Sequence, residues 1–352
     1  MPLSKLSTAS FEPNGISLPS ISASTQFNGM KNLLINGDFR VWQKGTDLNP
    51  LVTGNAVTGV DRWTNSYCDF VARLRRVEDT INGETVDTVE ITKSSGTYSS
   101  CEFTQKVETQ VAKYLRGQTV TFSFWVKKIG STFGSHSCQF WLGDSETVDD
   151  TGWTNQRTYD RGRSSGVVSG TTNTNIAFSN NNWVKYSITR TLSSDTNTIY
   201  CTIYTASTPT GEGIRIAKCQ LEIGDTATDF ERRPIALEAE MCKRYYETFG
   251  NGWPVRGEST NYSCVLFGNF KVEKRASPSI SVLTTNVRMY EWGVADRDAS
   301  TVTITSSSMI SGGGHVKLIG WSTIATGTIY GMGYNTTSGP TGGQPFGANA
   351  EF

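Results

Sequence analysis

Short segments in which apolar and polar residues alternate recur along this chain of 352 residues. In "VTFSFWVKK", Val120, Phe122, Phe124 and Val126 fall on one face of an extended strand. Similar alternation in "WVKYSITRTL" and "TIYCTIYT" is separated by Gly, Asn, Asp and Ser, which are typical of turns. The pattern predicts a mainly β protein whose antiparallel sheets pack face to face as a β-sandwich. A composition with 35 Gly and only 18% charged residues also favours strands and turns over helices.

The formal charges cancel, because Lys and Arg together number 32 and so do Asp and Glu. A neutral chain has no long-range field to attract nucleic acid or an anionic membrane, so neither partner is expected. No apolar run reaches the roughly 20 residues needed to cross a bilayer, and the first residues lack the layout of a secretory signal. The sequence therefore predicts synthesis in a cytosol, with export only as part of a larger assembly.

The seven cysteines are odd in number and never occur at C-x-x-C spacing. This arrangement indicates neither a zinc site nor a disulfide framework. Most of them lie in alternating apolar segments, as Cys201 does, so we expect small buried hydrophobic side chains. Unpaired thiols are compatible with folding in a reducing compartment.

Changes in pattern divide the chain into four parts. Residues 1–30 are rich in Ser and carry no sustained period, which predicts an arm that becomes ordered only against a partner; an idle disordered tail is the alternative. Residues 31–233 contain the predicted sandwich. Residues 251–352 predict a smaller β domain whose glycine-dense tail we expect to be held against neighbouring chains.

Residues 234–250 predict a helix that connects the two β regions. Pro234 suits the first turn of a helix and Gly250 a stop. Four apolar residues recur every four positions and would form one stripe: Leu237, Met241, Tyr245 and Phe249. The stripe must be buried either against the sandwich or against copies of itself around a symmetry axis.

Motifs for catalysis are missing from the sequence. His136 and His315 lie far apart, and no G-x-S-x-G context supports a Ser-His-Asp triad. A glycosidase needs two facing carboxylates; four acidic residues fall close together in a polar stretch, where solvation is the expected state: Asp144, Glu146, Asp149 and Asp150. The glycines of "SGGGH" precede neither the Lys-Ser/Thr nor the helix of a phosphate-binding loop. We therefore expect a protein that is not an enzyme and carries no cofactor.

Aromatic residues are the more informative group, with 9 Trp, 13 Tyr and 16 Phe. Sugars place their C–H faces on aromatic rings while polar side chains bind their hydroxyls. The long polar segment 143–175 offers this mixture, and its candidate glycan-binding residues are Trp153, Asn155, Gln156, Arg157, Tyr159 and Asp160. The alternative is that Trp153 and Tyr159 only attach a long loop to the sandwich. The aromatic residues of the C-terminal region form a second candidate surface: Trp253, Tyr262, Tyr290, Trp292, Trp321 and Tyr330.

Several motifs occur together and in order: "NLLINGDFRVWQKG" at 32–45, "VDRW" at 60–63, "AKCQLEIGDTATDFERRP" at 217–234 and "MCKRYYETFG" at 241–250. With the strand segments above, they resemble the carbohydrate-binding-type jelly-roll module of bacteriophage tail fibres. The resemblance covers about residues 32–250. The C-terminal region resembles the short β domain that often follows this module, and "MPLSKLSTASF" is similar to the starts of fibre proteins that attach to a virion.

The resemblance implies a jelly roll in which "NGDF" lies close to "QLEIG". Asn36 and Gly37 would supply positive φ angles for a tight bend, and Phe39 and Trp42 would carry apolar area into the sandwich. Related jelly rolls sometimes hold a structural calcium ion, for which Asp38 and Glu222 are the candidates here.

The resemblance also implies a function. It suggests a homotrimeric virion fibre or adhesin subunit, assembled in the host bacterial cytoplasm, attached to other virion proteins by its N-terminal arm, and binding a host cell-surface glycan without catalysis. Two alternatives remain open. The protein could be a structural decoration or connector of capsid or tail that binds only neighbouring virion subunits, or it could be a polysaccharide depolymerase.

Overall fold

The structure is a computed structural model of the whole chain. It describes residues 30–51, 57–68, 71–96, 101–131, 138–149, 164–166, 181–205, 208–250, 253–257, 263–283, 287–291, 295–299, 302–319, 329–334 and 346–351. The virion-attachment arm predicted for residues 1–30 lies outside this set except for its last residue.

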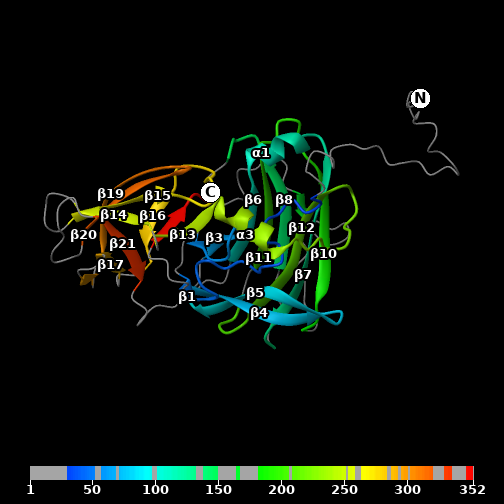
Figure 1. The fold of residues 1–352 in the computed structure, drawn as a ribbon. Coiled ribbons are helices and arrows are strands. Elements are labelled where there is room, and N and C mark those ends of the chain that lie inside the picture. Colours follow the sequence, from blue (N-terminus) through cyan, green and yellow to red (C-terminus); the bar gives the residue numbers. More distant parts are fainter. Residues whose placement is uncertain are drawn as a thin grey trace, which may run out of the picture.

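Two six-stranded antiparallel sheets form the larger unit, shown on the right of Figure 1. The first sheet has the order β1 (Asp47–Leu51), β4 (Val71–Ile81), β5 (Glu84–Ser95), β12 (Gly213–Ile223), β7 (Thr119–Ile129) and β10 (Val184–Thr191). The second has the order β2 (Val57–Thr58), β3 (Thr64–Cys68), β6 (Cys101–Val107), β11 (Thr198–Thr205), β8 (Cys138–Ser145) and β9 (Ser164–Gly166). The short helices α1 (Thr109–Ala112) and η3 (Lys113–Leu115) lead from β6 to β7. The predicted jelly-roll β-sandwich is confirmed.

The alternation in β7 places its apolar face in the core between the sheets. Val120, Phe122, Phe124 and Val126 are fully buried, as predicted. The rings of Phe124 and Phe140 meet edge to face across the two sheets with centroids 5.0 Å apart. This interdigitation joins the two layers into one hydrophobic core.

Strands β6 and β11 are buried on both faces, which their alternation did not predict. Every residue of each strand is buried. On the outer face of β11, the Tyr204 ring lies 5.8 Å from that of Trp141, and Thr202 Oγ1 lies 3.0 Å from Thr104 Oγ1. Polar residues that pair with one another can be buried at little cost. The polar residues of β6 and β11 therefore did not indicate an exposed face.

The described cysteine side chains behave as predicted. All are buried: Cys101, Cys138, Cys201, Cys219, Cys242 and Cys264. Burial raises the pKa of Cys138 to about 12, so this thiol stays protonated and unreactive at neutral pH.

The beginning and the end of the jelly roll lie side by side. Leu33 N donates to Leu221 O at 2.8 Å, and Cys219 N donates to Gly37 O at 2.8 Å. The Asn32 side chain adds bonds to Cys219 O and from Leu221 N. The predicted proximity of "NGDF" and "QLEIG" is therefore confirmed, with Phe39 fully buried and Trp42 packed against the core.

The bend in "NGDF" differs from the prediction in one respect. Positive φ angles occur at Asn36 (57°) and Phe39 (54°), and Gly37 does not adopt one. Gly37 is needed for a different reason, because a Cβ there would lie 2.1 Å from Cys219 O. Its missing side chain allows the two ends of the module to approach closely enough for the backbone hydrogen bond.

The predicted helix over residues 234–250 is wrong in its second half. Helix α3 (Ile235–Lys243) ends early, and Tyr246–Phe249 form strand β13. Tyr, Thr and Phe suit an extended strand, and pairing with β22 (Phe346–Asn349) outweighs the helical spacing. No helix of the described residues is long and apolar enough to span a membrane.

The face of α3 that is buried also differs from the predicted stripe. Glu238 and Cys242 are its buried residues, whereas Leu237 is 42% exposed. The reason is a buried ion pair: Arg233 Nε donates to Glu238 Oε2 at 2.7 Å and draws this carboxylate inward. A stripe counted from hydrophobicity could not include a charged residue.

The smaller unit contains a three-stranded and a seven-stranded antiparallel sheet, on the left of Figure 1. The first has the order β13, β22 (Phe346–Asn349) and β16 (Ser279–Val282). The second has the order β18 (Ala295–Ala299), β17 (Val287–Glu291), β21 (Ile329–Tyr334), β14 (Pro254–Gly257), β15 (Ser263–Asn269), β20 (Gly313–Ile319) and β19 (Thr303–Ile310). Residues 346–349 of the glycine-dense tail are thus held by two strands of the same chain, where we expected neighbouring chains.

Polar contacts attach this unit to the sandwich. The Arg62 guanidinium lies 3.4 Å from the centre of the Tyr245 ring, and Arg62 N donates to Glu351 Oε1 at 3.2 Å. On another part of the junction, Arg275 Nη1 donates to Asp149 Oδ2 at 3.2 Å. These contacts fix the two units against each other through buried cations.

A buried carboxylate at this junction makes stability depend on pH. Asp61 is fully buried and accepts hydrogen bonds from Gln43 N (2.7 Å) and Gln43 Nε2 (2.6 Å). Burial raises the pKa of Asp61 from 3.8 to about 6. Because the folded-state pKa lies above the unfolded value, the folded protein binds an extra proton between the two values, and stability falls as pH rises through this window.

We therefore expect Asp61→Asn to flatten the pH profile of stability between pH 4 and about 6. Relative to the wild type, the free energy of unfolding of the variant should gain about 2–3 kcal/mol between the lower and the upper end of this window. Urea unfolding at a series of pH values measures both profiles. The exposed Asp225→Asn variant is the control and should follow the wild type; parallel profiles for Asp61→Asn and wild type would contradict the assignment.

Candidate functional site

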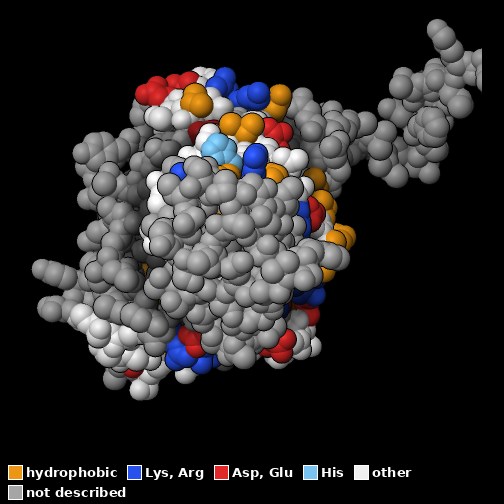
Figure 2. All heavy atoms as spheres, turned by 60° about the vertical axis from the view of Figure 1, so that its left-hand side comes forward, with side chains coloured by type: hydrophobic (Ala, Val, Ile, Leu, Met, Phe, Trp, Pro, Cys, Tyr) orange, Lys and Arg blue, Asp and Glu red, His pale blue; other side chains and the backbone are white. Residues whose placement is uncertain are grey.

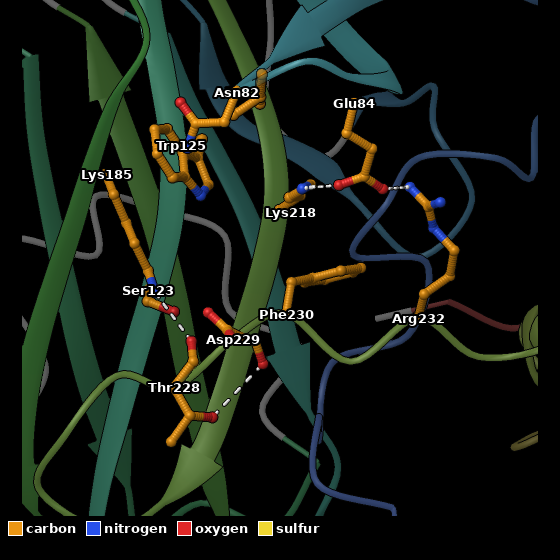
Figure 3. Close-up of a pocket in the computed structure, with 11 residues that line it drawn as sticks. Asn82, Glu84, Ser123, Trp125, Lys185, Lys218, Thr228, Asp229, Phe230 and Arg232 are labelled. Carbon is orange, nitrogen blue, oxygen red and sulfur yellow. Dashed lines mark hydrogen bonds and ion pairs between the residues drawn. The ribbon is translucent and has the colours of Figure 1, made fainter.

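A cleft of about 390 Å³ opens on the outer face of the first sheet (Figure 3). Its walls combine two aromatic side chains with charged and hydrogen-bonding groups: Trp125, Phe230, Asn82, Glu84, Ser123, Lys185, Lys218, Thr228, Asp229 and Arg232. We call it the Trp125 cleft. These residues come from β7, β10, β12, the turn between β4 and β5, and the segment that follows β12.

Strand pairing fixes the floor of the cleft. Trp125 lies in β7 and points away from the core, because the alternation of β7 directs Phe124 and Val126 inward. In β10, Lys185 is the residue directly opposite Trp125. In β12, on the other side of β7, the partner of Trp125 is Ala217.

A bulge in β12 brings a second lysine to the cleft. The pairing of β12 with β7 shifts between Ala217 and Gln220, and Lys218 within this interval has φ of 50°. A β-bulge changes the direction of a side chain locally. Lys218 consequently lines the cleft beside Trp125, on the side away from Lys185 (Figure 3).

A tight hairpin supplies one rim. β4 and β5 are joined by Asn82 and Gly83, whose φ angles are 51° and 83°, as a two-residue turn with two left-handed residues requires. Glu84 follows directly. It accepts a hydrogen bond from Lys218 Nζ at 2.5 Å and forms an ion pair with Arg232 Nη2 at 2.9 Å. The bond from Lys218 lowers the pKa of Glu84, so this carboxylate is ionised and serves to hold two cations in place.

The segment after β12 forms the opposite rim. Lys185 Nζ donates to Thr228 O at 2.9 Å, as drawn in Figure 3. Lys31, next to the first described residue, donates from its Nζ to Thr228 Oγ1 at 2.7 Å and to Asp229 O. The chain therefore enters the jelly roll immediately behind this rim.

The arrangement suits noncovalent binding of a polar molecule with apolar faces. Trp125 is half-buried, which leaves part of its indole ring accessible at the floor. Amide, hydroxyl, ammonium and carboxylate groups surround it within one cleft. This combination of a ring platform with several donors and acceptors is what a sugar residue requires.

The glycan-binding candidates chosen from sequence lie outside the described residues. Trp153, Asn155, Gln156, Arg157, Tyr159 and Asp160 all fall in the range 150–163, and their role stays a prediction. The Trp125 cleft was missed. Its signal was an aromatic residue on the otherwise polar face of β7, with Ser123 and Lys127.

Two of the four clustered acidic residues, Asp144 and Asp149, have structural roles. Asp144 was expected to be solvated, and this prediction is wrong. It is buried at the end of β8 and accepts hydrogen bonds from Arg190 Nε at 3.0 Å, Ser193 N at 3.0 Å and Thr196 Oγ1 at 2.6 Å. Burial acts to raise the pKa of Asp144, but these hydrogen bonds outweigh it and the pKa is lowered. Asp149 binds Arg275 at the junction described above.

The calcium candidates are engaged by donors of the chain itself. Asp38 pairs with Arg40, and Arg232 lies 4.0 Å away. Glu222 accepts hydrogen bonds from Gln220 Nε2 at 2.8 Å, from Thr228 N at 2.9 Å and from Thr228 Oγ1 at 2.6 Å. The residues that the structure describes contain no group of three or more His, Cys, Asp or Glu suited to a metal. Asp38 Oδ1 is buried without a hydrogen-bond partner among the described residues, and a calcium ion at Asp38 and Glu222 stays a prediction.

The second candidate surface is described only in part. Trp253 packs into the core of the C-terminal unit, with its ring centre 4.6 Å from that of Phe249. On the face of this unit shown in Figure 2, a histidine side chain lies among hydrophobic and basic side chains near the top. Exposed side chains of this region include Phe267, Ile310 and His315.

Comparisons with known proteins give distant structural likenesses. No family model matches the sequence, and a search of curated proteins found no significant match. One similar solved structure is a CBM4 carbohydrate-binding module, at 16% identity and TM-score 0.30, covering 54% of this chain and 98% of that one. Another is the CBM22-1 xylan-binding domain from Paenibacillus barcinonensis Xyn10C, at 12% identity and TM-score 0.32, covering 56% and 96%. A third is the enzymatically active domain of tailspike protein 4 from bacteriophage CBA120, at 12% identity and TM-score 0.30, covering 55% and 21%.

Proposed function

We propose that this protein is a bacteriophage virion fibre or adhesin subunit that binds a host cell-surface glycan without catalysing a reaction. The observation that carries the proposal is the Trp125 cleft, in which an accessible indole ring lies within a rim of hydrogen-bonding groups. The ring supplies a platform for the C–H face of a sugar, and the rim binds its hydroxyls.

The noncatalytic part of the proposal is supported by the ion pairs of one cleft carboxylate, Glu84. Glycoside hydrolysis needs one carboxylic acid with a raised pKa to protonate the leaving oxygen. Glu84 has a lowered pKa because Lys218 and Arg232 hold it ionised. It is therefore suited to positioning cations and not to donating a proton.

The proposals that the protein attaches to a virion and forms a trimer come from the sequence resemblance. Exposed Ile235 and Leu237 on α3 give the chain an apolar surface suited to contact with another subunit. Several identical sites on one fibre would convert individually weak glycan contacts into useful avidity.

Replacing Trp125 by Ala tests the proposal. We expect binding of the purified protein to host cells or to their surface polysaccharide to weaken by roughly thirtyfold, equivalent to about 2 kcal/mol for a central aromatic contact. Surface plasmon resonance on immobilised polysaccharide measures the change. Tyr114→Ala is the matched control, because Tyr114 is an exposed aromatic residue of η3 outside the cleft.

Because Trp125 also packs against a small apolar cluster, circular dichroism should first verify that the variant is folded. Equal binding by the folded Trp125→Ala variant and the wild type would refute the cleft as the glycan site. Release of reducing ends from the polysaccharide would instead favour a depolymerase. Imaging of virions with and without the chain tests its place on the particle.

A further inference from the structure

The cations of the Trp125 cleft outnumber its carboxylates. Lys185, Lys218 and Arg232 line it together with Glu84 and Asp229. Lys218 and Arg232 both pair with Glu84, and Arg232 also lies 4.0 Å from Asp38. Binding of a neutral sugar would not require more cations than carboxylates in the cleft.

Lys185 has a neutral partner. Its ammonium donates to the carbonyl oxygen of Thr228 at 2.9 Å, and among the described residues it has no ion pair. A lysine ammonium carries three donors. The carbonyl uses one of them and holds the group at the edge of the cleft, which leaves two donors and an uncompensated positive charge for a ligand.

The position of Lys185 relative to the indole defines what a ligand must look like. Lys185 is directly opposite Trp125 in the pairing of β10 with β7, so their side chains leave the sheet as neighbours on one face. A sugar ring stacked on Trp125 therefore carries its substituents within reach of the Lys185 ammonium. A carboxylate substituent would form a charge-assisted hydrogen bond there.

Asp229 does not abolish the preference of Lys185 for a carboxylate on the ligand. Its side chain is exposed, and its carbonyl oxygen accepts hydrogen bonds from Lys31, Gln220 and Thr228. Lys31 adds a further positive charge behind the same rim. The residues that line the cleft thus carry one more positive than negative charge, although the whole chain is neutral.

We infer that the Trp125 cleft selects an acidic glycan, in which a sugar ring bearing a carboxylate stacks on Trp125 and its carboxylate binds Lys185. This inference rests on the glycan-binding function proposed above and adds the class of sugar. The bound unit is a uronic acid or another carboxylated sugar of a surface polysaccharide.

The test uses the full chain on an array of bacterial polysaccharides, each printed in its native form and after reduction of its carboxyl groups to alcohols. We expect the bound polysaccharides to contain uronic acids or other carboxylated sugars. Reduction of the carboxyl groups should weaken their binding by about tenfold or more, the loss expected for one charge-assisted hydrogen bond. The loss should shrink at high salt.

Variants of Lys185 connect this preference to the cleft. Lys185→Met should bind the native polysaccharide about tenfold more weakly and the reduced form unchanged. Lys185→Arg keeps the charge and should retain most of the preference for the native form. Lys113→Met, at an exposed lysine of η3, is the control and should bind as the wild type.

The outcomes separate the two proposals. Binding to neutral polysaccharides, or equal binding before and after reduction, overturns the acidic-glycan inference and leaves the glycan-binding function standing. Loss of binding to both forms in Lys185→Met also overturns it, because the lysine would then support the cleft as a whole. Absence of binding to every polysaccharide on the array overturns the proposed function itself.

Discussion

Replacing Arg233 with methionine is expected to lower the free energy of unfolding by about 3–5 kcal/mol, because it leaves a buried carboxylate without its partner. The side chains of Arg233 and Glu238 are only 5% and 3% exposed, and they form two hydrogen bonds of 2.7 and 3.0 Å. Arg233 also donates to the backbone oxygens of Asn32 and Leu34. One side chain therefore joins the start of the jelly roll, its end and helix α3.

The adjacent arginine provides a matched control. Arg232 is 42% exposed, and Arg232→Met should change the free energy of unfolding by about 1 kcal/mol or less. Urea unfolding followed by circular dichroism compares the variants at one pH. An equal loss of stability in both methionine variants would show that the buried Arg233–Glu238 ion pair does not stabilise the fold more than the exposed Arg232 does.

Phe346→Ala is expected to destabilise the C-terminal unit by about 3–5 kcal/mol, the usual cost of removing a buried phenylalanine ring. Phe346 is fully buried in the middle strand of the three-stranded sheet, and its ring lies 5.6 Å from that of Phe249. The cavity would lie within the second hydrophobic core. The first core does not contain this residue, so the sandwich should keep its own stability.

Hydrogen exchange measured by mass spectrometry can distinguish the two units. We expect faster exchange in peptides from β15 and β20 of the Phe346→Ala variant and unchanged exchange in peptides from β7 and β11. Phe267→Ala is the control, because Phe267 is 38% exposed and should matter little. Equal acceleration in both units would show that they unfold as one.

The sequence predicted the sandwich because its main signal is local. In β7 the two-residue period assigns Phe122 and Phe124 to the core regardless of which strands lie beside it. The approach of residue 37 to residue 219 is a long-range feature, and it was predicted only through the motifs that resemble a known module.

The helix was misjudged at the positions where long-range pairing competes with local spacing. Tyr245 and Phe249 satisfy a helical period, but β22 arrives from about 100 positions later and pairs with Tyr246–Phe249. The burial of Glu238 was not predicted, because nothing nearby in sequence shows that Arg233 will be buried with it. Partners far apart in the chain decided both outcomes.

The cleft could be predicted only in part. Trp125 on the polar face of β7 was visible in the alternation, and so was Lys185 on the polar face of β10. The bulge that turns Lys218 toward the same cleft depends on how β12 pairs with β7 and has no local signature. The assembly of Glu84, Lys218 and Arg232 therefore required three-dimensional coordinates.

The closeness of the two ends of the jelly roll has a mechanical consequence. Leu34 and Arg233 are 199 positions apart in the chain yet in direct contact, and Lys31 lies against Thr228 behind the Trp125 cleft. Tension between a tether that precedes Met30 and a ligand held in the cleft would cross only this short edge. The load would pass from β10 and β7, which hold Lys185 and Trp125, through their pairing to β12 and then to this edge, while the strands of the second sheet lie outside this path.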